Sequence, residues 1–271
     1  MSKSLYERFL IEPGAKVRLD KLDPDDTTGC ETKDEARRRL ARNIERLAKR
    51  QYLLYAEGKR ALLVVFQAMD AGGKDGTIRQ VMSGLNPQSC RVTAFGAPSE
   101  VELAHDFLWR IHPAVPARGE IGIFNRSHYE DVLVVRVRKL VPKSVWSKRY
   151  RVINDFERAL AESGVTILKF FLHISREEQA ERLRERLTDP TKAWKLSATD
   201  FEDRSRWGAY MKAYEAALGR CSTPWAPWFA IPANKNWFRN LAVSEIIAHT
   251  LDGLDMAYPK PAFDPATIVV K

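Results

Sequence analysis

The segment 67–77 combines glycines, one lysine and two aspartates directly after a short apolar run. The run 61–66 is typical of a buried strand, and residues 78–85 show a helical pattern. A strand, a glycine-rich turn, a lysine and a helix in this order are the context of a phosphate-binding loop. Small residues let backbone N–H groups approach phosphate oxygens, and the helix start adds roughly half a positive charge. We therefore expect Lys74 to reach a phosphate that is being transferred.

The loop departs from the usual Walker A pattern, because Ala68 replaces a glycine and Asp75 replaces the serine or threonine after the lysine. The hydroxyl that is lost normally binds Mg²⁺. Asp70 is the candidate replacement, because a carboxylate beside phosphates is unfavourable unless a cation lies between them. The flanking strand and helix argue against the alternative, a glycine-rich turn that only links the two. The residues predicted to bind phosphate or nucleotide here are Ala71, Gly72, Gly73, Lys74, Asp75, Gly76, Thr77 and Arg79.

A second polar cluster, 125–131, follows the apolar strand pattern 120–124. In open parallel sheets, ligands bind beyond the carboxyl ends of the strands. Arg126 offers a planar fork to phosphate oxygens, and Glu130 and Asp131 could hold Mg²⁺ or orient a nucleotide. A solvated loop and helix start is the alternative, since acidic residues favour the first turn of a helix. The other predicted binding residues of this cluster are Asn125 and Arg136.

Residues 176–207 hold many basic side chains and few strong core positions. This pattern predicts a lid that closes over phosphates and excludes water. Arg182 and Arg186 are four residues apart and would share one helix face. The interleaved glutamates leave open the alternative of a salt-bridged surface helix. The predicted phosphate contacts of the lid are Arg182, Arg186, Lys192 and Lys195.

The elements that must position these groups alternate between strands and helices. This alternation predicts an α/β fold of three layers, with a parallel central sheet, a helical lid and a long N-terminal helix. We expect one domain over 1–271, in which 1–57 form an arm and a helix and 1–31 are irregular. The predicted strands are 61–66, 91–95, 120–124, 166–174 and 228–231. The predicted helices are 32–56, 78–85, 99–111, 132–140, 152–162, 177–187 and 238–251.

Composition narrows the class of protein further. The formal charge is +9, which suggests a polyanionic partner, either a nucleic acid or a long phosphate chain. No apolar run reaches the ~18 to 20 residues of a membrane span, and the first ten residues do not resemble a secretory signal. The three cysteines form no CxxC pair and are expected to be reduced thiols. These features predict a cytoplasmic protein.

Several motifs in order resemble the second family of polyphosphate kinases, which is similar in fold to thymidylate kinase. The resemblance covers most of 53–251. An aspartate directly after the loop lysine, as at Asp75, is common in this family. It implies that Asp70 is a metal-associated carboxylate and that Lys74 grips the phosphate. The segments that carry the resemblance are 68–77, 124–131, 153–157, 169–175, 189–197 and 226–237.

The motif 124–131 also resembles one subgroup of that family. Some members have Asp where Asn125 stands and Trp-Tyr-Asn where residues 128–130 stand. The variation seen in this chain is similar to class III, which accepts AMP as well as ADP. The family usually forms dimers or tetramers, which an exposed N-terminal helix would suit.

The resemblance implies reversible transfer of a phosphoryl group from inorganic polyphosphate to AMP or ADP with Mg²⁺, and no nucleic-acid or membrane partner. Two alternatives stay open. An ATP-dependent nucleoside monophosphate kinase would share the fold, but should keep Ser or Thr at position 75. A non-enzymatic nucleic-acid-binding protein would suit the charge, but leaves the loop unexplained. The expected catalytic residues are Asp70, Lys74, Arg126, Asp131 and Arg182, with Asp70 and Asp131 as metal ligands.

Overall fold

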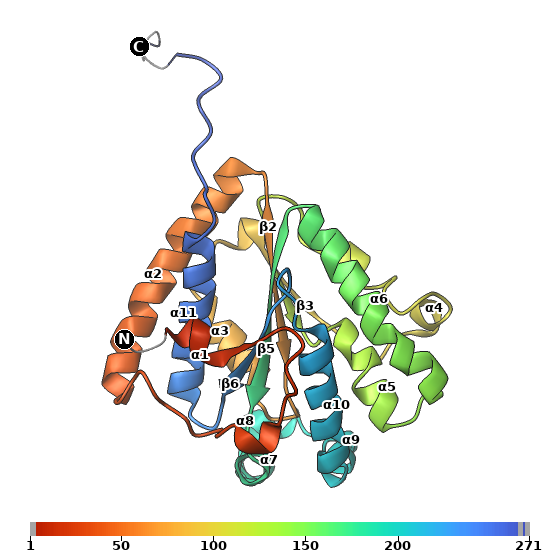
Figure 1. Ribbon diagram of the computed structural model, residues 1–271. Helices are drawn as coiled ribbons and strands as arrows, with labels where there is room; N and C mark the ends of the chain where they lie inside the picture. Colours follow the sequence, from red (N-terminus) through yellow and green to blue (C-terminus); the bar gives the residue numbers. More distant parts are fainter. Residues whose placement is uncertain (1–3, 265–267, 269–271) are drawn as a thin grey trace.

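Five parallel strands and one short antiparallel strand form the central sheet, with helices on both faces (Figure 1). The computed structural model describes residues 4–264 and 268. The strand order is β1-β6-β5-β2-β4-β3, and only β1 runs antiparallel to its neighbour. The predicted three-layer α/β fold with a parallel sheet is therefore confirmed. The strands are β1 (Leu10–Ile11), β2 (Ala61–Gln67), β3 (Cys90–Ala94), β4 (Ile121–Asn125), β5 (Val165–His173) and β6 (Trp228–Pro232).

The central strand β2 is buried along its whole length. In register, Val64 lies between Ile123 of β4 and Leu168 of β5. A parallel strand that is covered on both faces needs a continuous apolar run, which is the pattern that the sequence shows here. Because β2, β4 and β5 are parallel neighbours, the segments that follow them all emerge at one edge of the sheet.

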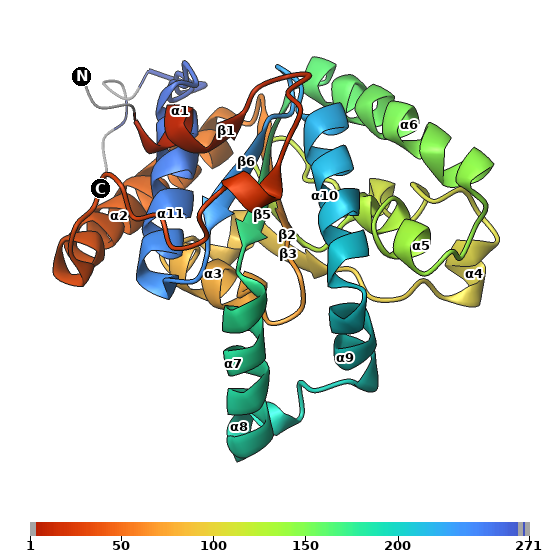
Figure 2. The ribbon, with the colours of Figure 1, turned by 60° about the horizontal axis from the view of Figure 1, so that its bottom comes forward.

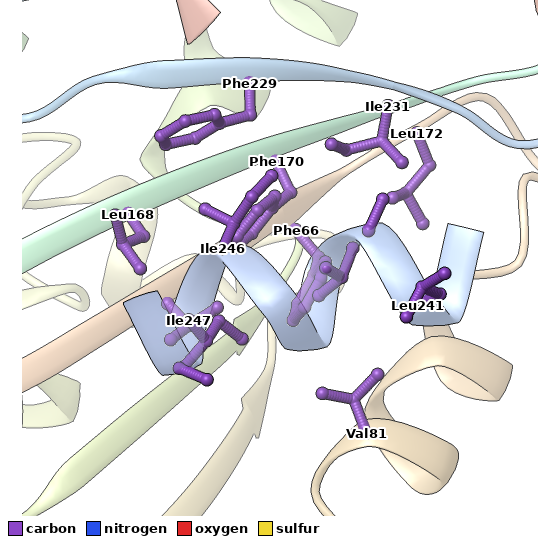
Figure 3. Packing of buried hydrophobic residues seen from close by; sticks show 14 of the residues in the cluster. Phe66, Val81, Leu168, Phe170, Leu172, Phe229, Ile231, Leu241, Ile246 and Ile247 are labelled. Carbon is purple, nitrogen blue, oxygen red and sulfur yellow. The ribbon is translucent and has the colours of Figure 1, made fainter. Parts of the chain in front are cut away.

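One face of the sheet is covered by α1 (Leu5–Phe9), α2 (Lys33–Glu57), α3 (Lys74–Val81) and α11 (Asn236–Asp252). Figure 3 shows Leu241 and Ile246 of α11 packed beside Phe66 and Phe170 of the sheet. The long N-terminal helix is confirmed as α2. The side chain of Thr32 accepts a hydrogen bond from the backbone at its start, and the left-handed Gly58 ends it.

The opposite face is covered by α4 (Glu100–Leu103), α5 (Val134–Val137), α6 (Lys143–Glu162) and α10 (Trp207–Cys221) (Figure 1). A second apolar cluster forms between these helices and the sheet, and includes Ile153, Phe171, Tyr214 and Trp228. Short 3₁₀ turns connect several elements. They are η1 (Leu19–Lys21), η2 (Pro87–Ser89), η3 (His112–Ala114) and η4 (His128–Asp131).

The predicted lid segment falls on three helices that project from the body of the molecule (Figure 2). They are α7 (Arg176–Thr188), α8 (Pro190–Ala193) and α9 (Ala198–Ser205). The side chain of Ser175 caps α7 by accepting a hydrogen bond from the backbone of Glu178. In the described part of the chain, no helix combines the length and the apolar composition that a membrane span requires.

Four predicted helix ranges differ from the structure by more than two residues, and one of them, 78–85, is α3 (Lys74–Val81). The helix 99–111 is interrupted, because α4 ends at Leu103 and the side chain of Asp106 then binds the backbone of Leu108. The helix 132–140 is shorter, because Leu133 is not helical and Lys139 has a left-handed backbone. The helix 152–162 begins earlier, as α6 at Lys143, directly after a proline that suits a helix start.

Outside the lid, two helices and one strand were missed by the sequence analysis. The arm 1–31 is not irregular throughout, because it contains α1 and the strand β1, which pairs with β6. The helix α10 returns the chain from the lid to the sheet. Its buried face contains both alanines and tyrosines, such as Ala213 and Tyr214, and is not a simple aliphatic stripe.

A buried ion pair joins the sheet to α6. Lys169 of β5 lies 2.5 Å from a carboxylate oxygen of Glu157, and both side chains are fully buried. The Lys169 ammonium also donates to the hydroxyl of Tyr129 and to the carbonyl of Cys221. The Glu157 carboxylate accepts from Tyr129 and contacts His128, so this network connects β5, α6, η4 and the end of α10.

We expect Lys169→Met to lower the free energy of unfolding by about 3–5 kcal/mol, because it leaves the Glu157 charge buried without its cation. Urea denaturation followed by circular dichroism measures this quantity. Lys148→Met, at an exposed position of α6, is the matched control and should change the value by less than about 0.5 kcal/mol. Equal stability of the two variants would show that the ion pair does not support the fold.

Candidate phosphate-binding site

One cavity of about 860 Å³ opens where the glycine-rich loop, the ends of β3 and β4, the lid and α11 meet. Most of the residues predicted for the site line this cavity, although they come from distant parts of the sequence. The predicted residues among its lining are Asp70, Ala71, Gly72, Gly73, Lys74, Asp75, Gly76, Arg79, Asn125, Arg126, Arg182, Arg186, Lys192 and Lys195. The predicted residues outside its lining are Thr77, Glu130, Asp131 and Arg136.

The shape of the loop explains its composition. A side chain at Gly72 would overlap Ala68 and the carbonyl of Met69. Gly73 has a φ of 95° and directly precedes α3, which begins at Lys74, four residues earlier than the predicted helix 78–85. Such a backbone is unfavourable for residues other than glycine. The loop therefore presents backbone N–H groups at a helix start to the cavity, as a phosphate-binding loop requires.

Lys74 lies inside the cavity lining and is buried. Its ammonium donates to the carbonyl of Ala68 at 3.1 Å, which leaves further N–H bonds available. Burial and the nearby Arg126 lower the pKa of Lys74. A neighbouring anion would offset this loss of hydration, which is what a bound phosphate provides.

Asp70 and Arg126 form an ion pair of 2.8 Å between the loop and the end of β4. Arg126 has a left-handed backbone, with a φ of 63°, which turns the chain sharply after the strand. The pair also lines a second, smaller pocket with Glu130 and Tyr214. Burial raises the pKa of the Glu130 carboxyl. Asp70 and Arg126 thus lie at the boundary between a basic cavity and a pocket with an acidic, aromatic lining.

Asp75 connects three parts of the site. Its carboxylate accepts from the amide of Asn125 at 2.8 Å and from the ammonium of Lys195 at 3.4 Å. The residue that replaces the usual hydroxyl therefore links the loop to β4 and to the lid. The hydroxyl of the next threonine, Thr77, donates to the carbonyl of Gly73 and stabilises the first turn of α3.

The lid cations have partners within the protein. Arg182 donates to the backbone carbonyls of Ala71, Ala233 and Asn234, and so braces the loop. Arg186 lies 3.5 Å from Asp200, and Lys192 pairs with two acids of the lid itself. The salt-bridged surface considered from sequence thus describes part of the lid. These pairs lie beside the cavity, where phosphate oxygens could replace the carboxylates.

Asp131 and Arg136 bind partners on α6. The Asp131 carboxylate is 2.6 Å from Arg149, and burial raises its pKa to about 6. Arg136 donates to the hydroxyl of Tyr150 and lies over the ring of Trp146. Within residues 4–264 and 268, no three acidic, histidine or cysteine side chains converge on one metal position. A metal shared by Asp70 and Asp131 stays a prediction, and of the two only Asp70 lines the cavity.

Sequence reasoning missed one cationic residue of the lining, Arg239 of α11. It stands at the start of an apolar helix pattern, where an arginine is usually exposed. The available signal was its place a few residues beyond the late strand β6, because segments after parallel strands reach the same edge of the sheet.

A phosphate-binding loop below a basic cavity, with a helical lid above it, defines a P-loop phosphotransferase. Residues 30–259 match the family model described as Polyphosphate kinase 2 (PPK2). The chain therefore belongs to the polyphosphate kinase 2 family.

Similar proteins cover nearly the whole chain. An AMP/ADP-polyphosphate phosphotransferase of Meiothermus ruber is 56% identical over 98% of this chain and 100% of its own length. An ADP-polyphosphate phosphotransferase of Rhodopseudomonas palustris is 46% identical, over 94% of this chain and 92% of that protein. The crystal structure of Polyphosphate Kinase 2 from Arthrobacter aurescens TC1 superposes with a TM-score of 0.94 at 43% identity, covering 97% of this chain and 94% of that one.

We expect Lys74→Ala to reduce the turnover number by on the order of 100-fold or more, because it removes a preorganised cation from the transferred phosphate. The fold should persist, since the change also removes a poorly hydrated charge. Steady-state kinetics and thermal unfolding measure the two effects. Lys59→Ala, at an exposed position before β2, is the control and should keep full activity. Near-wild-type turnover of Lys74→Ala would contradict this role.

Proposed function

We propose that the chain transfers a phosphoryl group from inorganic polyphosphate to AMP and ADP, and that the reaction is reversible. The observation that carries this proposal is the charge of the cavity lining, which has eight Lys or Arg against four Asp or Glu around a phosphate-binding loop. A long polyanion that lies across the loop and the lid can contact many of these cations at once. A nucleotide alone presents fewer phosphates to them.

The 56% identical relative from Meiothermus ruber is named as acting with both AMP and ADP. The match covers 98% of this chain, which supports acceptance of both nucleotides here. The variation at residues 125 and 128–130, which resembles class III, supports the same conclusion.

The transfer itself needs no covalent enzyme intermediate. A terminal phosphate oxygen of the nucleotide attacks the end phosphorus of polyphosphate, and the P–O bond to the next phosphate breaks on the opposite side. The nucleotide gains one phosphoryl group, and the polyphosphate leaves one unit shorter. The loop N–H groups, Lys74 and Arg126 stabilise the charge on the equatorial oxygens, while the lid excludes water.

Magnesium fits this site as a complex with the phosphates. Mg²⁺ is commonly bound by one or two carboxylates together with phosphate oxygens and water, and not by a cage of protein ligands alone. Asp70 lines the cavity beside the loop and offers such a carboxylate once phosphate competes for Arg126. The ion would neutralise phosphate charge.

The decisive assay incubates purified protein with Mg²⁺, long-chain polyphosphate and either AMP or ADP, beside reactions that have ATP as the donor. We expect ADP and ATP to form from AMP only with polyphosphate, and a metal chelator should abolish the transfer. Transfer to ADP but not to AMP would reject the class III assignment. Transfer from ATP alone would favour a nucleoside monophosphate kinase, and the absence of any transfer, with salt-dependent nucleic-acid binding, would favour a binding protein.

We also propose a homodimer or homotetramer that forms through the outer face of α2. Tyr52 and Tyr55 on this helix are 61% and 55% exposed, and aromatic residues are enriched at protein interfaces. Light scattering should give twice or four times the chain mass of 31.0 kDa. Tyr55→Glu should lower that mass, because it places a charge in the interface. A wild-type mass equal to that of one chain would contradict the proposal.

A further inference from the structure

Arg239 is a buried arginine on a helix of the rigid core. Only 3% of its surface is exposed, and it lines the cavity from the first turns of α11. Further along, α11 packs apolar residues such as Leu241 and Ile246 onto the sheet (Figure 3). The lid arginines lie on helices that project from the body (Figure 2). Arg239 therefore keeps its place in the cavity wall whatever the position of the lid.

The hydrogen bonds of Arg239 leave its charge uncompensated. Its guanidinium donates to the side-chain oxygen of Asn236 at 2.8 Å and to that of Asn240 at 3.0 and 3.2 Å. Both acceptors are neutral amides, and each Nη atom keeps a second N–H bond. In the part of the chain that the structure describes, no carboxylate forms an ion pair with it. A buried guanidinium without a counter-ion is unfavourable in the free protein.

The surroundings of Arg239 are themselves positive. Its guanidinium lies against Gly73, where a side chain would overlap it, and Arg182 reaches the same position. Gly73 directly precedes α3, whose positive end faces the same space and has no side-chain cap. Burial and the nearby Arg182 lower the pKa of Arg239 to about 9. Two guanidinium groups and a helix start thus converge beside the loop, and an anion would relieve their repulsion.

We propose that Arg239 is a fixed binding residue for the polyphosphate donor, whose guanidinium binds a phosphate oxygen beside the loop before the lid closes. This inference rests on the function proposed above, because it takes polyphosphate as the anion. A guanidinium fork suits two oxygens of one phosphate and forms strong, charge-assisted hydrogen bonds. Because the contact exists equally before and during transfer, Arg239 sets the affinity for the donor and leaves the chemical step nearly unchanged.

The test compares Arg239→Met with wild type in donor kinetics. We expect the KM for polyphosphate to rise about 10- to 100-fold, because charge-assisted hydrogen bonds to one phosphate are lost. The turnover number and the KM for ADP should stay within about threefold. Arg151→Met, which removes an exposed arginine of α6, is the matched control and should leave all three values unchanged.

A second readout separates binding from a structural role. Inorganic tripolyphosphate without nucleotide should raise the melting temperature of the wild type and of Arg151→Met, and much less that of Arg239→Met. The melting temperature of free Arg239→Met should equal or exceed that of the wild type, since an unpaired buried charge is removed. If Arg239→Met does not fold, Arg239→Lys keeps the charge without the fork and should still raise the KM for polyphosphate.

Two results would overturn the inference. An unchanged KM for polyphosphate with a lower melting temperature would make Arg239 a structural brace of the loop. A lower turnover number with an unchanged KM would show that it positions the loop for chemistry. In both cases the wild type would still use polyphosphate, whereas failure of the proposed function itself would appear as a wild type that transfers nothing from this donor.

Discussion

Repulsion between cations is the physical constraint on which this site depends. Lys74, Arg126, Arg182 and Arg239 share the wall of one cavity, and Lys74 and Arg239 are buried. The protein compensates them in three ways. Carboxylates pair with Arg126 and Arg182, backbone carbonyls accept from Lys74 and Arg182, and neutral amides accept from Arg239. None of these partners carries the charge of a phosphate chain. A site organised in this way is most stable when a polyanion is bound, which couples substrate binding to the stability of the loop.

The buried network of Lys169 and Glu157, between β5 and α6, restricts the motif 124–131. Tyr129 and His128, within that motif, both contact the buried carboxylate of Glu157, which is in turn paired with Lys169. Arg126 lies three residues before Tyr129, and its left-handed backbone directs its side chain towards the loop. A buried network that is largely satisfied restricts the backbone around it, so Arg126 lies next to a segment that has little freedom to move.

Sequence reasoning succeeded where the signal is local. The loop around Lys74 and the strand β2 are recognisable because a phosphate cradle and a doubly covered strand need particular residues at adjacent positions. It failed where the partner lies far away in the chain. The pairing of Asp131 with Arg149 and the contact of Arg239 with Gly73 depend on how helices pack. The helix α10 was missed for the same reason, because its buried tyrosines pack against residues of the sheet that are distant in the sequence.

The short antiparallel strand β1 has a consequence for the solubility of the folded chain. By pairing with β6 it occupies the hydrogen-bonding edge of a wholly buried strand, which would otherwise offer a template to other chains. The opposite edge, β3, is partly exposed and carries Arg91 beside the half-exposed Val92, so a charge protects it instead. In the described sheet, one edge is therefore covered by backbone pairing and the other is protected by charge. The amino-terminal arm, which supplies β1, is thus an integral part of the sheet.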